Sequence, residues 1–143
     1  MINIKIVDID MILGGKEKDK KIELLSWLWD CFESYALIDN VESVVNLLIN
    51  YAISEKDLEI KEEILDTIQI ATIYRDVKAC KLYLLEHHID IFSDNMILII
   101  IAIFESTYDE RYINILEKLS NNLNENISKG AKEAIEEIKC NVD

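Results

Sequence analysis

The chain has 143 residues, of which half are hydrophobic and 30% are charged, and its formal net charge is −13. This composition is typical of a globular protein rather than a disordered one, and the length suits a single domain with a substantial core. The acidic balance disfavours binding to nucleic-acid phosphates and to anionic membrane surfaces, and it favours basic protein partners. Acidity that only keeps the protein soluble is the plainer interpretation.

The cysteines and the first residues indicate the compartment. Cys31, Cys80 and Cys140 are odd in number and widely spaced, which indicates neither a disulfide framework nor a zinc site. We expect all three on apolar helix faces. Residues 1–5 lack the charged and then apolar pattern of a signal peptide. The sequence therefore predicts a cytoplasmic protein.

The absence of proline and the presence of only three glycines favour long helices with short polar connections. In residues 1–13 the isoleucines fit both a strand and a helix, and we favour a helix that ends at Gly14-Gly15. A second helix opens with the charged segment 16–21 and runs to about Ala36, with Trp29 in the core. Capping residues then predict the starts of the six remaining helices: Asp39 or Asn40, Asp57, Asp76, Ser93 or Asp94, Asp109, and the polar segment 124–128.

The predicted sixth helix contains nine consecutive apolar residues, Met96 to Phe104. Such a segment is buried on all sides, either in a core or in a membrane. Because the run is about half the length of a membrane-spanning helix, we expect it at the centre of the core.

The apolar positions repeat along the chain with a period of 34–36 residues. The pattern Ile64, Leu65, Ile68 recurs 36 residues later as Ile100, Ile101, Phe104. It recurs 36 residues earlier at Leu28, Trp29 and Phe32, and the first helices of the pairs keep nearly the same offset. A fixed period of this length is the signature of a helical repeat. It divides one all-helical domain, 1–143, into units of about 1–40, 41–76, 77–111 and 112–143.

The last unit resembles the HEAT-repeat family. An aliphatic helix, residues 112–119, is followed by an Asn-rich turn and by a helix with spaced alanines at Ala131 and Ala134. The family's usual proline is absent, and its Val-Arg pair is only loosely echoed, by Ile127 and Lys129 in the last unit and by Ile60-Lys61 in the second. The resemblance implies an all-α, right-handed α-solenoid of about four helix pairs whose second helices line a concave face. An irregular helical bundle is the alternative.

The sequence contains no catalytic, metal-ligating or cofactor-binding motif. His87 and His88 are adjacent, so on a helix they point about 100° apart and cannot jointly hold a metal. We expect them at a helix C-terminus. The sequence therefore predicts no enzyme, no metal and no cofactor. A metal-dependent helical enzyme is disfavoured, and so is a HEAT-like DNA glycosylase, because its groove would be basic.

Acidic residues are concentrated in the second helices of the first two units. If those helices line a concave face, they form an acidic groove that captures a basic partner. Trp27 is predicted to be more exposed than Trp29 and to act as an anchor, the alternative being packing against the first helix. The candidate partner-binding residues are Glu23, Trp27, Asp30 and Glu33 in the first unit and Glu59, Glu62, Glu63 and Asp66 in the second.

The profile of a small, acidic chain without catalytic motifs is similar to that of bacterial immunity proteins. This resemblance implies a non-enzymatic protein that binds a basic toxin, such as a nuclease, and covers its active site. A HEAT-like scaffold or adaptor protein that uses an apolar edge is the alternative.

Overall fold

The computed structural model describes residues 1–141 and is all-helical, as predicted. Within this range it has eight α-helices and two short 3-10 helices, and its only β structure is one isolated bridge. The chain divides into two compact units, unit 1 from Met1 to Leu82 and unit 2 from Tyr83 onward. We describe each unit by itself. The single domain and the four-repeat solenoid remain predictions.

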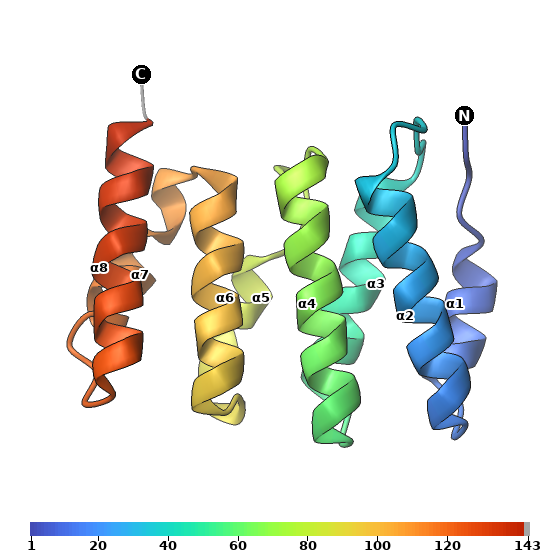
Figure 1. Ribbon diagram of the computed structural model, residues 1–143, viewed down its shortest axis with the longest axis horizontal. Helices are drawn as coiled ribbons and strands as arrows, with labels where there is room; N and C mark the ends of the chain where they lie inside the picture. Colours follow the sequence, from blue (N-terminus) through green and yellow to red (C-terminus); the bar gives the residue numbers. More distant parts are fainter. Residues whose placement is uncertain (142–143) are drawn as a thin grey trace. The chain divides into compact units, whose positions relative to one another are not determined.

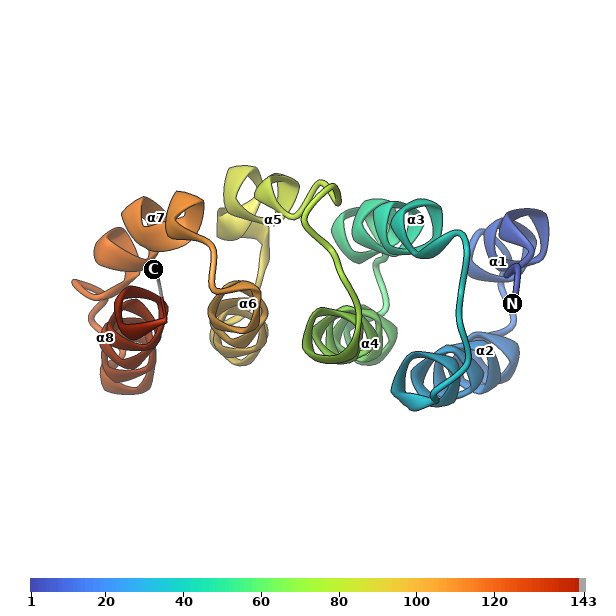
Figure 2. The ribbon, with the colours of Figure 1, turned by 90° about the horizontal axis from the view of Figure 1, so that it is seen from above.

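Unit 1 contains four helices in two layers: α1 (Ile6–Leu13), α2 (Lys18–Glu33), α3 (Val41–Ser54) and α4 (Leu58–Tyr74). The long helices α2 and α4 lie side by side, and α1 and α3 form the second layer over them (Figures 1 and 2). The apolar stripes of all four helices face inward, as their spacing predicts. The core includes Leu28, Phe32, Leu48 and Ile64, which are almost completely buried.

Arg75, the residue that ends α4, fastens α2 to α4. Its guanidinium group donates four hydrogen bonds to backbone carbonyls at and just beyond the end of α2, namely those of Cys31, Phe32, Ser34 and Ala36, at 2.7–3.0 Å. The last carbonyls of a helix lack partners within the helix and carry partial negative charge. One arginine therefore supplies the end of α2 with both hydrogen bonds and a positive charge.

Unit 2 contains α5 (Tyr83–His87), η1 (Ile89–Ile91), α6 (Asp94–Thr107), η2 (Glu110–Tyr112), α7 (Ile113–Leu119) and α8 (Glu125–Cys140). The helix α8 packs along both α6 and α7 (Figure 2). Ser93 caps α6 through its hydroxyl oxygen, and Asn124 caps α8 through its amide oxygen. In the core, the rings of Phe104 and Tyr112 stack with their centroids 4.4 Å apart.

The structure corrects several helix boundaries. Residues 1–5 are not helical: Ile2 pairs with Ile38 in a parallel bridge, and α1 begins only at Ile6. The helix α2 ends at Glu33 rather than near Ala36. The predicted helix after Asp76 is reduced to α5, which starts at Tyr83, because residues 75–82 form turns and extended backbone. Apolar spacing alone did not distinguish this irregular segment from a helix.

Three expectations about burial are also corrected. Trp29 is half-buried rather than in the core, because its indole nitrogen reaches outward to the carboxylate of Glu33. Cys80 is buried, but Cys31 is only half-buried and Cys140 is exposed. In the run from Met96 to Phe104 six residues are buried, whereas Leu98, Ile99 and Ala102 are half-buried. No helix within residues 1–141 has both the length and the apolar character needed to cross a bilayer.

Candidate protein-binding surface

The outward side of α4 carries the four acidic residues singled out in the second predicted repeat. Glu59, Glu62, Glu63 and Asp66 have the spacing i, i+3, i+4 and i+7 and therefore share one face of the helix. The buried stripe of α4, which includes Ile64 and Ile68, lies on the opposite face. Glu59 and Glu63 are exposed, and Glu62 and Asp66 are half-buried. These four carboxylates form one acidic stripe.

The electrostatics of Asp66 show how crowded this stripe is. Partial burial, followed by the nearby carboxylates of Glu63 and Glu62, raises the pKa of Asp66 from 3.8 to about 6. Burial and like charges both disfavour the ionised form of a carboxyl group. A cation that approached the acidic stripe would relieve this repulsion, so the stripe is suited to binding positive charge.

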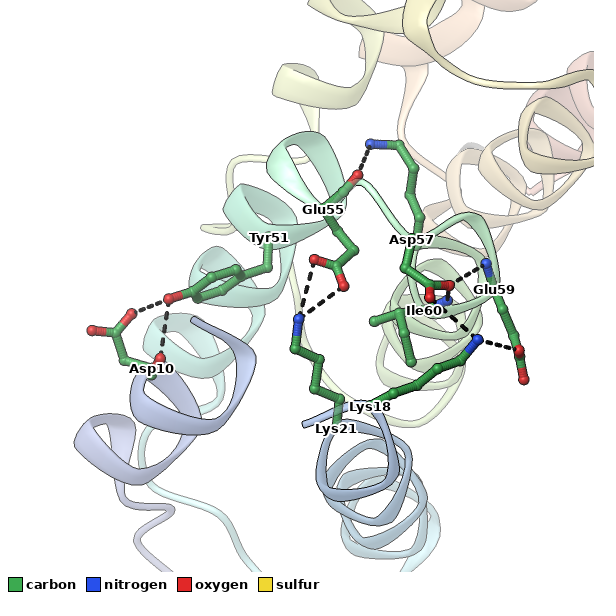
Figure 3. Close-up of polar contacts among 9 residues, drawn as sticks. Asp10, Lys18, Lys21, Tyr51, Glu55, Asp57, Glu59 and Ile60 are labelled. Carbon is green, nitrogen blue, oxygen red and sulfur yellow. Dashed lines mark hydrogen bonds and ion pairs between the residues drawn. The ribbon is translucent and has the colours of Figure 1, made fainter. Parts of the chain in front are cut away.

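One end of the stripe already has a cationic neighbour. The ammonium group of Lys18, at the start of α2, lies 3.2 Å from the carboxylate of Asp57 and 2.8 Å from that of Glu59 (Figure 3). The same contacts raise the pKa of Lys18. The hydrogen bond that Asp57 accepts from the backbone amide of Ile60 at the start of α4, followed by the contact with Lys18, lowers the pKa of Asp57. Glu59 is therefore partly neutralised within the chain, which leaves Glu62, Glu63 and Asp66 as the stronger candidates for contacting a partner.

The helix α2 adds further carboxylates beside α4. Glu23 and Asp30 are exposed and seven residues apart, so they share the face of α2 that lies opposite its buried stripe at Leu25, Leu28 and Phe32. The carboxylate of Glu33 accepts a hydrogen bond from the indole of Trp29. The helices α2 and α4 are neighbours in one layer (Figure 2). Their acidic outward faces therefore lie side by side.

Trp27 follows Glu23 by four residues and precedes Asp30 by three, so it lies on the same outward face of α2 as these carboxylates. Its side chain is 49% exposed and lines a groove together with Ile4 of the amino-terminal segment and Ile9 of α1. The structure therefore combines both interpretations of this residue, since it contacts the amino-terminal elements and still presents an exposed aromatic surface.

Two exposed side chains that the sequence analysis did not single out continue the outward side of α4. Ile73 is 51% exposed and Tyr74 is 55% exposed, and both belong to the last turn of the helix. The signal was present in the sequence, because Ile73 follows Asp66 by seven residues and so lies on the same face. The outward side of α4 thus changes from acidic to apolar and aromatic, a combination suited to a protein partner.

Unit 2 contains a second group of carboxylates that was also missed. Partial burial, followed by the negative charges of Glu137 and Glu133 on α8, raises the pKa of Glu105 on α6. Carboxylates therefore also gather in unit 2, beyond the first two repeats in which the sequence predicted the acidic site. Periodicity placed Glu105 at the end of an apolar helix but could not show that α8 brings two carboxylates near it.

Polar contacts between helices, two of them from buried lysines, hold α1, α2, α3 and α4 together. The ammonium group of Lys21 lies 3.0 Å from one carboxylate oxygen of Glu55, and both side chains are almost fully buried (Figure 3). The hydroxyl of Tyr51 donates to the carboxylate of Asp10, which raises the pKa of Tyr51 to about 12. The ammonium group of Lys61 donates to the backbone carbonyls of Ile53 and Glu55 at 3.0 and 3.1 Å, and burial lowers its pKa.

The histidine pair lies at the end of α5, as predicted. The ring of His87 contacts Tyr83 edge to face, and Nδ1 of His88 lies 2.9 Å from the carbonyl oxygen of Leu84. Nowhere in residues 1–141 do three His, Cys, Asp or Glu side chains gather as a metal ion would require.

No protein-family model matches the chain, and no curated protein or solved structure is significantly similar to it.

Proposed function

We propose that this chain is a non-enzymatic protein-binding module whose acidic surface on α2 and α4 captures a basic protein. The favoured partner is a toxin domain of the nuclease type, which would make the chain a bacterial immunity protein of the cytoplasm. In this proposal the helix pairs stack as a HEAT-like right-handed solenoid, with α2 and α4 lining its concave face.

The observation that supports this proposal most directly is the acidic stripe on α4. Four carboxylates share one outward face, and partial burial, followed by the negative charges of Glu63 and Glu62, raises the pKa of Asp66 to about 6. A nuclease that binds phosphates carries the complementary positive charge in its active site. Opposite potentials accelerate the encounter of two proteins and select against acidic competitors.

The proposed mechanism is occlusion of the toxin's active site. Glu62, Glu63 and Asp66 pair with lysine or arginine side chains that would otherwise contact nucleic acid. Tyr74 and Ile73 cover apolar surface beside those cations, as aromatic and aliphatic residues do at the centres of protein interfaces. Trp27, beside Glu23 on α2, adds an aromatic contact next to the groove that it forms with Ile4 and Ile9.

The experiment is co-expression of this chain with the toxin or effector encoded by the adjacent gene, followed by pull-down and measurement of affinity. We expect the double variant Glu62→Lys/Glu63→Lys to weaken binding by at least about tenfold and to lower the association rate. Raising the salt concentration should slow the association of the wild-type protein.

The matched control is Glu110→Lys/Glu117→Lys, which changes the net charge equally at two exposed residues of unit 2. Equal weakening by both double variants would show that net charge alone matters and would contradict a specific surface on α4. Binding that survives both high salt and the reversal of Glu62 and Glu63 would contradict the electrostatic mechanism.

A scaffold or adaptor protein is the second candidate function. It is favoured by apolar side chains that α1 exposes, since Val7 is 72% and Met11 is 68% exposed and they lie one helical turn apart. An adaptor would bind through this edge, and its affinity would be insensitive to the charge reversal on α4.

A further inference from the structure

The amino-terminal segment, residues 1–5, is not helical, and one of its backbone edges is in use through the bridge of Ile2 with Ile38. The amide of Ile2 donates to the carbonyl of Leu37, and the carbonyl of Ile2 accepts from the amide of Asp39. Two residues later, the amide and carbonyl of Ile4 both bond to the side-chain amide of Asn40, at 3.0 and 2.6 Å. The backbone groups of Ile2 and Ile4 therefore point to the same side, toward residues 37–40.

The opposite backbone edge of this segment is unused within the chain. In an extended strand, backbone groups of successive residues point to alternate sides, so the N–H and C=O of Asn3 point away from residues 37–40. Among the hydrogen bonds of residues 1–141, none uses either of these two backbone groups. The side chain of Asn3 bonds to Asp39, which leaves the backbone edge itself open.

A groove runs along this open edge. It has a volume of about 370 Å³, and its walls are Ile2, Asn3, Ile4 and Lys5 on one side and Asp8, Ile9, Leu24 and Trp27 on the other. Side chains of an extended segment alternate between its two faces. A groove that touches four consecutive residues of such a segment must therefore follow its backbone. Figure 2 shows the start of the chain between α1 and α2, the helices that form the other wall.

The groove continues into a second cavity of about 550 Å³ that shares Leu24 and Trp27 with the first and is also lined by Ile12, Lys20 and Glu23. The two shared residues, Leu24 and Trp27, are apolar, and the lining also includes Lys5, Asp8, Lys20 and Glu23. The half-exposed indole of Trp27 stands where the two cavities meet. Open backbone groups beside apolar pockets are what a protein uses to bind an extended peptide as an added strand.

We propose that this groove binds an extended peptide of apolar and basic residues, which pairs through its backbone with Asn3 and inserts an apolar side chain against Trp27. The extended backbone follows from the open edge, and the apolar side chain follows from Leu24, Ile9 and Trp27. The charged side chains of the groove itself balance, Lys5 and Lys20 against Asp8 and Glu23. The basic character of the peptide therefore follows from the net charge of −13 of the whole chain, which attracts cations over a longer range. The same charge disfavours a second copy of this chain as the occupant. The site goes beyond the proposed function, because it does not use the carboxylates of α4.

The test is an NMR titration of the isotope-labelled full chain with the peptide acetyl-Lys-Val-Lys-Val-Lys-Val-amide. We expect saturating shifts at the backbone amide of Asn3, at Leu24 and at the indole N–H of Trp27. A control peptide with the same side chains but N-methyl groups on alternate backbone amides cannot pair as a strand. It should bind at least about tenfold more weakly, because it loses backbone hydrogen bonds.

Two matched variants at Asn3 distinguish the contribution of its backbone N–H to peptide binding from that of its side chain. Asn3→Pro removes the open N–H and should lower the affinity for the peptide at least about tenfold. Asn3→Ala retains the N–H, so its affinity for the peptide should stay within about twofold of that of the wild-type protein. Circular dichroism of both variants checks that the helices are intact. Trp27→Ala, at a partly exposed position, should lower the affinity for the peptide, because the apolar contact is lost.

Three results would overturn the proposal: no saturation up to roughly 5 mM peptide, equal binding of the N-methylated peptide, or shifts confined to α4. The last result would still agree with the acidic surface, so the two proposals fail separately. Self-association that Asn3→Pro abolishes would show that the occupant is a second copy and would also overturn the proposal.

Discussion

The two units are both helical, but they hold their helices together by different means. In unit 1, cationic side chains reach between helices: Arg75 binds the end of α2, Lys61 binds the end of α3, and Lys21 pairs with Glu55. In the described part of unit 2, the main contacts between helices are apolar, and Ser93 and Asn124 satisfy helix ends locally. The difference teaches that similar helix pairs can depend on different chemistry, and it predicts which substitutions each unit tolerates.

Apolar packing in unit 2 gives the largest expected effect. Phe104 is fully buried and stacks on Tyr112, so Phe104→Ala removes a ring and leaves a cavity. We expect the free energy of unfolding of unit 2 to fall by about 3–5 kcal/mol. Urea denaturation followed by hydrogen exchange at amides of α6 and α8 measures it. The control is Leu123→Ala at a fully exposed position, where we expect almost no change.

This prediction also tests whether the units are energetically separate. If amides of α2 and α4 lose as much protection as those of α6 and α8, the chain unfolds as one cooperative body. The comparison between the units would then apply to their contacts only and not to their stability. A loss below about 1 kcal/mol would contradict the importance of the stacked pair itself.

The polar contacts of unit 1 give the next largest effect. Arg75→Met removes four hydrogen bonds from a charged donor to the end of α2, and we expect a loss of about 2 kcal/mol, because water replaces part of them. Arg75→Lys keeps the charge but not the planar arrangement of donors, so its loss should be intermediate. Thermal and urea denaturation measure both variants.

The control for Arg75 is Lys81→Met, which removes a cation from an exposed position in the same unit. Equal losses for Arg75→Met and Lys81→Met would show that positive charge, rather than the bonds at the end of α2, stabilises unit 1. If Arg75→Lys is as stable as the wild-type protein, the forked geometry is unimportant and the contrast between the units becomes weaker.

The sequence predicted the part of the fold that depends on periodicity. The spacing of apolar residues gave the all-helical class and the approximate positions of α2, α3, α4, α6 and α8, since each buries a continuous stripe. The cap at Asp57 was also predicted, and Ser93 was one of two candidates for the start of α6, because a short polar side chain before an apolar stripe is a local signal. The cap at Asn124 was placed only within the polar segment 124–128.

Features that depend on contacts distant in sequence were not predictable in the same way. The strand-like segment at Ile2 and Ile4 is fixed by residues 37–40, and the bonds of Arg75 depend on where α2 ends. The candidate surface was predicted in part. Helical spacing placed Glu62, Glu63 and Asp66 on one face, but only the structure showed Lys18 beside Glu59 and Trp27 in a groove with α1.

The smallest predicted effect concerns the acidic stripe itself and depends on pH. Because folding raises the pKa of Asp66 from 3.8 to about 6, its ionised form opposes folding above that value. We expect Asp66→Asn to increase the free energy of unfolding by about 1 kcal/mol at pH 8, a value reduced to allow for solvent screening of a half-exposed group.

The sign of this effect reverses the usual behaviour of a carboxyl group. As the pH falls through about 6, Asp66 binds a proton in the folded state, and the advantage of Asp66→Asn shrinks. Below 3.8 the carboxyl is protonated in both the folded and unfolded states, so the difference should vanish and the low-pH measurement is the internal control. Urea denaturation at a series of pH values measures it, and an advantage that stays constant with pH would show that side-chain shape rather than charge is responsible. A basic partner that binds the stripe would favour the ionised form of Asp66 and so lower its pKa, which NMR titration of the complex can detect.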